Sequence, residues 1–113
     1  MKNILEKIVQ DKKEALNLIK KDNSLDSLEK KIKKLNCFYN FKEKIKKNNG
    51  VSLIAEIKKA SPSAGILVEK FNHVDIAKMY IDHGATCLSV LTEEKYFLGN
   101  LEYIKDIKKN FKI

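Results

Sequence analysis

The chain has 113 residues, a formal net charge of +8 and 43% hydrophobic residues. This length allows one domain with a modest core, and no stretch approaches the roughly 18 uncharged apolar residues of a membrane span. All 23 Lys and Arg residues are lysine, which argues against a dedicated nucleic-acid reader because arginine makes the bidentate contacts to bases and phosphates. The N-terminal residues do not resemble a signal peptide. We therefore expect a cytoplasmic protein with a solvated lysine surface that binds neither nucleic acid nor membranes.

The first part of the chain is predicted to be helical. Apolar residues recur at three- and four-residue steps over residues 3–21 and again over residues 25–35, which is typical of amphipathic helices. Asn40 and Glu43 have the spacing of a capping box, which predicts a short third helix ending near residue 47. The lysines of the second helix are expected to face water, and a basic binding face is the alternative. Residues 1–48 would thus form a helical extension that ends at Asn48-Asn49-Gly50.

An apolar run over residues 51–58 is the first predicted strand. Side chains alternate along a strand, which gives one face with Leu53, Ala55 and Ile57 and a second with Ile54, Glu56 and Lys58. Two apolar faces, charged only at the C-terminal end, are typical of a parallel sheet covered on both sides. Functional groups gather at that end of such sheets, so Glu56 and Lys58 are candidate site residues. The alternative is an ion pair at a solvated strand end.

A long loop follows this strand. Pro62 cannot donate a hydrogen bond to a strand ladder and is expected to end the strand. The loop continues to about Asn72, which is longer than the usual 2 to 6 or so residues between a strand and a helix. Ser61, Ser63 and Gly65 offer hydroxyl groups and accessible backbone amides, which suit an anionic group such as phosphate.

A helix and a second strand come next. Asn72 as the N-cap and Gly84 after the last turn delimit the helix, and the β-branched and apolar run over residues 86–91 is the second strand. A helical connection between two strands predicts a parallel pair with a right-handed crossover. With a final helix over residues 100–109, residues 51–113 are expected to form an α/β unit.

Two aromatic residues follow the second strand, and two cysteines lie elsewhere in the chain. Tyr96 and Phe97 either line an apolar ligand pocket or cover the top of the sheet. Cys37 and Cys87 match no metal-ligand spacing. We therefore expect them to be reduced structural thiols, and we expect no metal site.

Two segments carry a specific resemblance to a known family. They are residues 52–65, SLIAEIKKASPSAG, and residues 91–103, LTEEKYFLGNLEY. With them, the helical opening over residues 4–13 is similar to indole-3-glycerol phosphate synthase, an enzyme of tryptophan biosynthesis. The resemblance implies a (β/α)8 TIM barrel with extra N-terminal helices, of which this chain holds the helices and the first two βα units. It also implies a carboxy-lyase that closes the ring of 1-(2-carboxyphenylamino)-1-deoxyribulose 5-phosphate with decarboxylation and dehydration, and that needs no cofactor or metal.

The resemblance implies roles for four residues. Glu56 and Lys58 correspond to catalytic residues at the top of the first strand: Lys58 would hold anionic groups and stabilise charge during ring closure, and Glu56 would orient it and the substrate hydroxyls. Ser61 is similar to the serine that lines the site, and Phe97 to the aromatic residue that packs on the anthranilate ring. The family commonly has lysine where this chain has Ala64, which weakens any role of that loop in closing over substrate.

The length of the chain departs from the family. A TIM barrel needs about 250 residues, and the family's general-acid lysine lies on the third strand, beyond Ile113. We expect a truncated chain that is inactive alone, since a missing general acid costs roughly 10² to 10⁴ in rate. The alternatives are a half enzyme that combines with another chain and a non-catalytic module on the same scaffold. The expected partners are the sugar-phosphate substrate and the missing C-terminal barrel portion, or further copies that join open sheet edges.

Two other functions stay open at this point. One is a non-catalytic, lysine-rich interaction module that binds acidic partners or nucleic acid. The other is phosphoribosylanthranilate isomerase, a related barrel enzyme, to which the helical extension and the strand with Glu56 and Lys58 are less similar.

Overall fold

The computed structural model describes residues 3–47 and 49–113. The expected chain break at Asn48 therefore lies partly outside the described residues, as do Met1 and Lys2. The chain consists of two compact units, Met1–Phe38 and Tyr39–Ile113. None of the helices in the described part of the chain is both long enough and apolar enough to cross a bilayer.

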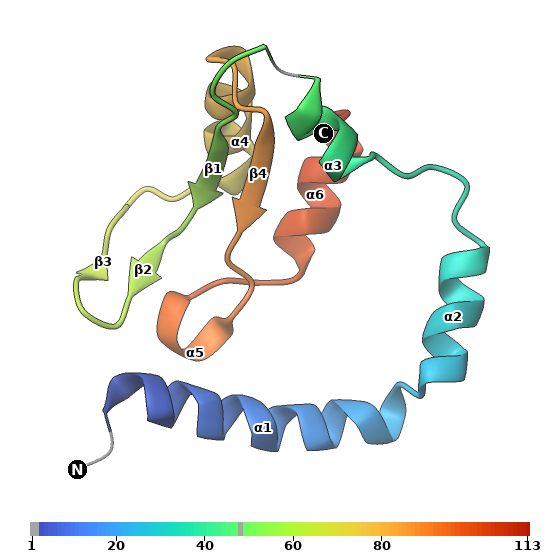
Figure 1. The fold of residues 1–113 in the computed structure, drawn as a ribbon. Helices are drawn as coiled ribbons and strands as arrows, with labels where there is room; N and C mark the ends of the chain where they lie inside the picture. The colour runs from blue at the N-terminus through green and yellow to red at the C-terminus, as the bar shows by residue number, and fades with distance from the viewer. Residues whose placement is uncertain (1–2, 48) are drawn as a thin grey trace. The chain divides into compact units, whose positions relative to one another are not determined.

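The first unit contains two helices, α1 (Ile4–Asp22) and α2 (Leu25–Lys33) (Figure 1). Each begins at a side-chain cap, where Asn3 Oδ1 accepts from the Glu6 amide at 2.9 Å and Ser24 Oγ accepts from the Ser27 amide at 3.2 Å. The predicted spans are confirmed to within two residues at each end. Neither helix contains a buried residue, and most of the apolar residues that predicted them are exposed.

The described residues of the second unit form four further helices and four strands. In chain order they are α3 (Phe41–Lys46), β1 (Ile54–Ile57), β2 (Ala60–Ser61), β3 (Gly65–Ile66), α4 (His73–Asp82), β4 (Cys87–Val90), α5 (Glu94–Phe97) and α6 (Glu102–Asn110). The predicted caps of α3 and α4 are confirmed: Asn40 Oδ1 accepts from the Glu43 amide, and Asn72 Oδ1 from the amides of Val74 and Asp75. Gly84 follows α4 with a φ of 89°, as a residue after the last turn requires.

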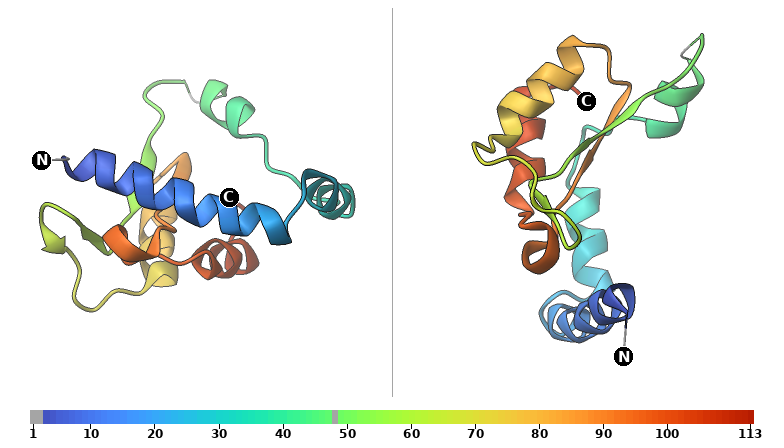
Figure 2. Two further views of the ribbon diagram at one scale, coloured as in Figure 1. Left: turned by 90° about the horizontal axis from the view of Figure 1, so that it is seen from below. Right: turned by 90° about the vertical axis from the view of Figure 1, so that its left-hand side faces the viewer.

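The two longer strands form a parallel pair, as predicted. Their register runs from Ile54 opposite Cys87 to Ile57 opposite Val90. Figure 2 shows α4 and α6 on the same side of this pair. The core lies between them, where Ile57, Ala77 and Ile107 are almost fully buried, so one strand and both helices contribute to it.

The prediction that β1 is covered on both faces is wrong for the described residues. Ala55 and Ile57 are buried against the helical layer, whereas Ile54 on the opposite face is 49% exposed. Leu53, expected on the buried face, is also exposed at the start of the strand. The reason is that α4 and α6 cover one face of this two-stranded sheet.

Two short elements were not predicted. The loop after β1 contains the antiparallel hairpin β2–β3, in which Ala60 pairs with Ile66 and Ser61 with Gly65. Gly65 has a φ of 68°, a conformation that glycine adopts without a steric penalty. The segment after β4 contains the four-residue helix α5. Elements this short have no periodicity for a sequence pattern to reveal.

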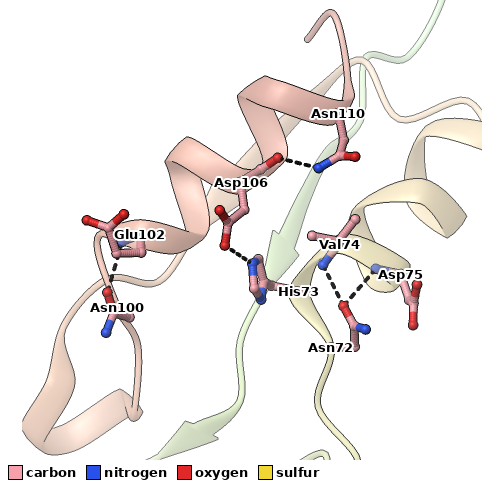
Figure 3. A network of polar contacts seen from close by, with 8 residues as sticks. All are labelled: Asn72, His73, Val74, Asp75, Asn100, Glu102, Asp106 and Asn110. Carbon is pink, nitrogen blue, oxygen red and sulfur yellow. Dashed lines mark hydrogen bonds and ion pairs between the residues drawn. The ribbon is translucent and has the colours of Figure 1, made fainter.

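Polar and aromatic contacts join α4 to α6, and Figure 3 shows the polar one between His73 and Asp106. His73 Nε2 lies 3.0 Å from Asp106 Oδ2, and the His73 ring stacks on Tyr103 with centroids 4.3 Å apart. Asn110 Nδ2 donates to the Asp106 carbonyl at 2.8 Å. This contact ties the first turn of α4 to the middle of α6, and so helps to hold the helical layer against the sheet.

We expect His73 and Asp106 to be energetically coupled. In a double-mutant cycle of His73→Ala and Asp106→Ala, the coupling free energy should be about 0.5 to 1 kcal/mol, the range of a partly exposed hydrogen bond. Urea denaturation of the four proteins measures it. Asp75→Ala, which removes an exposed carboxylate from the same turn of α4, is the control. Strictly additive effects of the two substitutions would contradict the assignment.

Candidate functional site

The candidate site lies where the two parallel strands end. In Figure 1 the arrows of β1 and β4 point the same way, and the β2–β3 hairpin and α5 lie beyond them. The hairpin follows β1 and α5 follows β4, and α5 lies against β2. The strand ends therefore bring together two segments that are separated in the sequence by α4 and β4.

Glu56 and Lys58 form an ion pair at the end of β1. Lys58 Nζ lies 2.7 Å from Glu56 Oε1, and the Lys58 and Glu56 side chains are 32% and 45% exposed respectively. Ala55 and Ile57 point into the helical layer, so alternation places Glu56 on the opposite face of the sheet. The Tyr80 hydroxyl donates to the Glu56 carbonyl at 3.1 Å and fixes the end of the strand to α4.

This pair can present a fixed positive charge to a ligand. One Glu56 oxygen orients the ammonium group of Lys58, which keeps further donors for an anion. Exposed ion pairs contribute little to stability, so the pair does little for folding. The geometry offers an oriented cation at the open side of the sheet.

Ser89 is a neighbour of this pair that the sequence did not single out. It lies directly opposite Glu56 in the parallel register, and side chains of register partners share a face of the sheet. A hydroxyl group is thus placed beside the carboxylate. Only the register identifies it, since Ser89 is one of several small polar residues in the sequence.

Ser61 takes part in the β2–β3 hairpin. Its Oγ accepts from the Ala64 amide at 3.2 Å and lies 3.5 Å from Ser63 Oγ. These contacts close the turn that Pro62 begins. Ser61 therefore has a local structural role, and it lies in the same short strand that contacts α5.

Phe97 is the last residue of α5 and is half-buried. The helix begins at Glu93, whose carboxylate accepts from the amides of Lys95, Tyr96 and Phe97 at 3.1, 2.6 and 3.2 Å. This cap was not predicted from the sequence. Glutamate is not among the residues preferred at this position, so the sequence offered no strong signal for it.

Gly99 ends this segment in a very close contact with the backbone. A Cβ atom added to Gly99 would lie 2.2 Å from the Leu91 carbonyl oxygen. Only glycine allows the chain to return so closely to the end of β4. The chain after α5 therefore passes directly against the residue that follows β4.

The second unit also has an apolar cavity of about 340 Å³ between α3, β4 and α6. Its lining includes Phe41, Cys87, Leu88 and Ile104. Cys87 is buried and Cys37 is exposed, and both are free thiols. Within residues 3–47 and 49–113, no three His, Cys, Asp or Glu side chains come together as metal ligands do.

Comparison with known proteins gives a consistent result. The family model described as indole-3-glycerol phosphate synthase matches residues 5–113. Two similar proteins are named indole-3-glycerol phosphate synthase. The one from Clostridium acetobutylicum is 50% identical over 107 residues, and the one from Aliarcobacter butzleri is 46% identical over 110 residues. The matches cover 94% and 95% of this chain, and 40% and 42% of those proteins. The chain therefore spans about two fifths of the length of the curated relatives it matches.

Proposed function

The chain belongs to the indole-3-glycerol phosphate synthase family, and on that basis we propose that it carries part of the substrate site of such an enzyme. The reaction converts 1-(2-carboxyphenylamino)-1-deoxyribulose 5-phosphate into indole-3-glycerol phosphate, carbon dioxide and water. The observation that carries the proposal is the ion pair of Glu56 and Lys58, which lies on the open face at the C-terminal end of β1.

We assign Lys58 to the binding of an anionic group of the substrate and to the stabilisation of charge during ring closure. An ammonium group held 2.7 Å from a carboxylate is already oriented before substrate arrives, so little reorganisation is needed in the transition state. Glu56 is the residue that orients it and that accepts from substrate hydroxyls. Ser61 lines the site from the hairpin, and Phe97 packs on the anthranilate ring.

The fold supports a more specific assignment within a TIM barrel. We propose that β1 with α4 and β4 with α6 are the first two βα units, and that residues 1–48 are a helical extension before them. The exposed side chain of Ile54 supports this, because the open face of β1 would become the barrel interior. The cavity beside β4 supports it too, because the next strand of a barrel would pair along the free edge of β4.

A hybrid enzyme tests the proposal. In the hybrid, residues 5–113 of this chain replace the matching segment of the Clostridium acetobutylicum relative. The relative supplies the part of the enzyme that this chain does not cover. We expect the hybrid to form indole-3-glycerol phosphate, measured by its fluorescence and by release of carbon dioxide. The unaltered relative is the positive control. A folded hybrid without activity would rule out the proposed function.

The polypeptide of residues 1–113 serves as the second arm of this experiment. We expect no product from it alone, because by resemblance the general-acid lysine belongs to the third strand of the barrel. The loss of that acid costs roughly 10² to 10⁴ in rate. Addition of the complementary part of the relative as a separate chain is expected to restore some product.

A further inference from the structure

We propose that Glu93 is a positioning residue for the aromatic end of the substrate, and that it acts through Phe97. The inference rests on the proposed function, in which Phe97 packs on the anthranilate ring. Glu93 itself touches no reacting atom. What points to its role is the set of hydrogen bonds that its carboxylate accepts from the backbone of α5.

Both oxygens of the Glu93 carboxylate are occupied by backbone amides. Oε1 accepts from the Lys95 amide at 3.1 Å, and Oε2 accepts from the amides of Tyr96 at 2.6 Å and Phe97 at 3.2 Å. This engagement suits a cap and not a catalytic base. The bond to the Phe97 amide makes the link between the two residues direct.

The short helix α5 cannot hold its own shape. A helix of four residues fixes its backbone dihedrals for too few internal hydrogen bonds, and such nuclei are unfavourable in isolation. The first amides of any helix lack internal partners. The Glu93 carboxylate satisfies three of these amides, and charge-assisted bonds are the stronger kind.

The backbone of Glu93 also binds the far end of the α5 segment. The Gly99 amide donates to the Glu93 carbonyl at 2.7 Å, after Leu98 turns the chain with a φ of 51°. Glu93 therefore receives hydrogen bonds from both ends of the segment, through its side chain at the start and its backbone at the finish. Phe97 lies between these two anchors, so its position depends on Glu93.

The test compares kinetic constants of the hybrid enzyme and its Glu93→Ala variant. We expect the KM for the substrate to rise about tenfold, as the loss of a strong helix cap allows, while kcat changes by less than about twofold. This pattern follows because packing on an aromatic ring is the same in the ground state and the transition state. Glu93→Asp, which keeps a capping carboxylate, should restore most of the affinity. Glu93→Gln should be intermediate, because its amide nitrogen cannot accept a hydrogen bond.

A double-mutant cycle separates positioning from a general effect on folding. If Glu93 acts through Phe97, then Glu93→Ala should change the KM by less than about twofold once Phe97 is replaced by alanine. Glu94→Ala is the matched control, since it removes the neighbouring exposed carboxylate at the same helix end. A normal KM for Glu93→Ala, or additive effects with Phe97→Ala, would overturn the inference and leave the proposed function standing. A hybrid that is inactive before any substitution overturns both.

Discussion

Replacement of Lys58 by alanine in the hybrid enzyme is expected to lower kcat/KM for indole-3-glycerol phosphate formation by about 10² to 10³, the usual cost of losing one oriented electrostatic donor. The physical reason is the preorganisation of the ammonium group by Glu56 at 2.7 Å. Water that enters in place of Lys58 would have to reorient as charge develops. The decrease should be visible in single-turnover rates as well as in the steady state.

The specificity of this effect has a matched control. Lys59→Ala removes the same charge from the next residue, whose backbone carbonyl, and not its side chain, holds the hairpin through the amides of Leu67 and Val68. We expect this variant to keep nearly full activity. Lys58→Arg should recover little, because a planar guanidinium cannot occupy the place of a compact ammonium group. Equal activity of Lys58→Ala and the parent hybrid would remove Lys58 from the catalytic assignment.

Among alanine substitutions at the glycines of this chain, we expect Gly99→Ala to lower the stability most. The new Cβ would lie 2.2 Å from the Leu91 carbonyl oxygen and 2.7 Å from its carbon. Both neighbours are backbone atoms at the end of β4, so neither can rotate away. The segment would have to shift as a whole, and we expect a loss of about 3 kcal/mol in the free energy of unfolding.

Gly65→Ala provides the comparison for this substitution. Gly65 has a φ of 68° but nothing lies within 4 Å of its added Cβ, so only the left-handed backbone costs energy, about 1 to 2 kcal/mol. Thermal unfolding of the two hybrid variants, followed by circular dichroism, measures the difference. Gly99→Ala should also raise the KM, because α5 and Phe97 move with the segment. The reverse order of stabilities would show that the contact with Leu91 relaxes without cost.

The functional assignment depends on an arrangement that the sequence could suggest only in part. Alternation along a strand predicted that Glu56 and Lys58 share a face, and the ion pair agrees with it. The exposure of Ile54 was not predictable from the same residues. An apolar residue at this position gives the strand the same alternating pattern whether or not another element packs over that face. The structure thereby distinguishes the helical face of β1 from its open face.

Local signals in the amino-acid sequence were enough to specify most of the helices and both parallel strands. Amphipathic periodicity specified α1, α2, α4 and α6, and side-chain caps at Asn40 and Asn72 specified where two helices begin. The β2–β3 hairpin, the α5 turn and the place of Ser89 opposite Glu56 emerged only once the chain was folded. The physical reason differs between them: the hairpin and α5 are too short to show a periodicity, whereas the place of Ser89 depends on the register between β1 and β4, which are far apart in the chain.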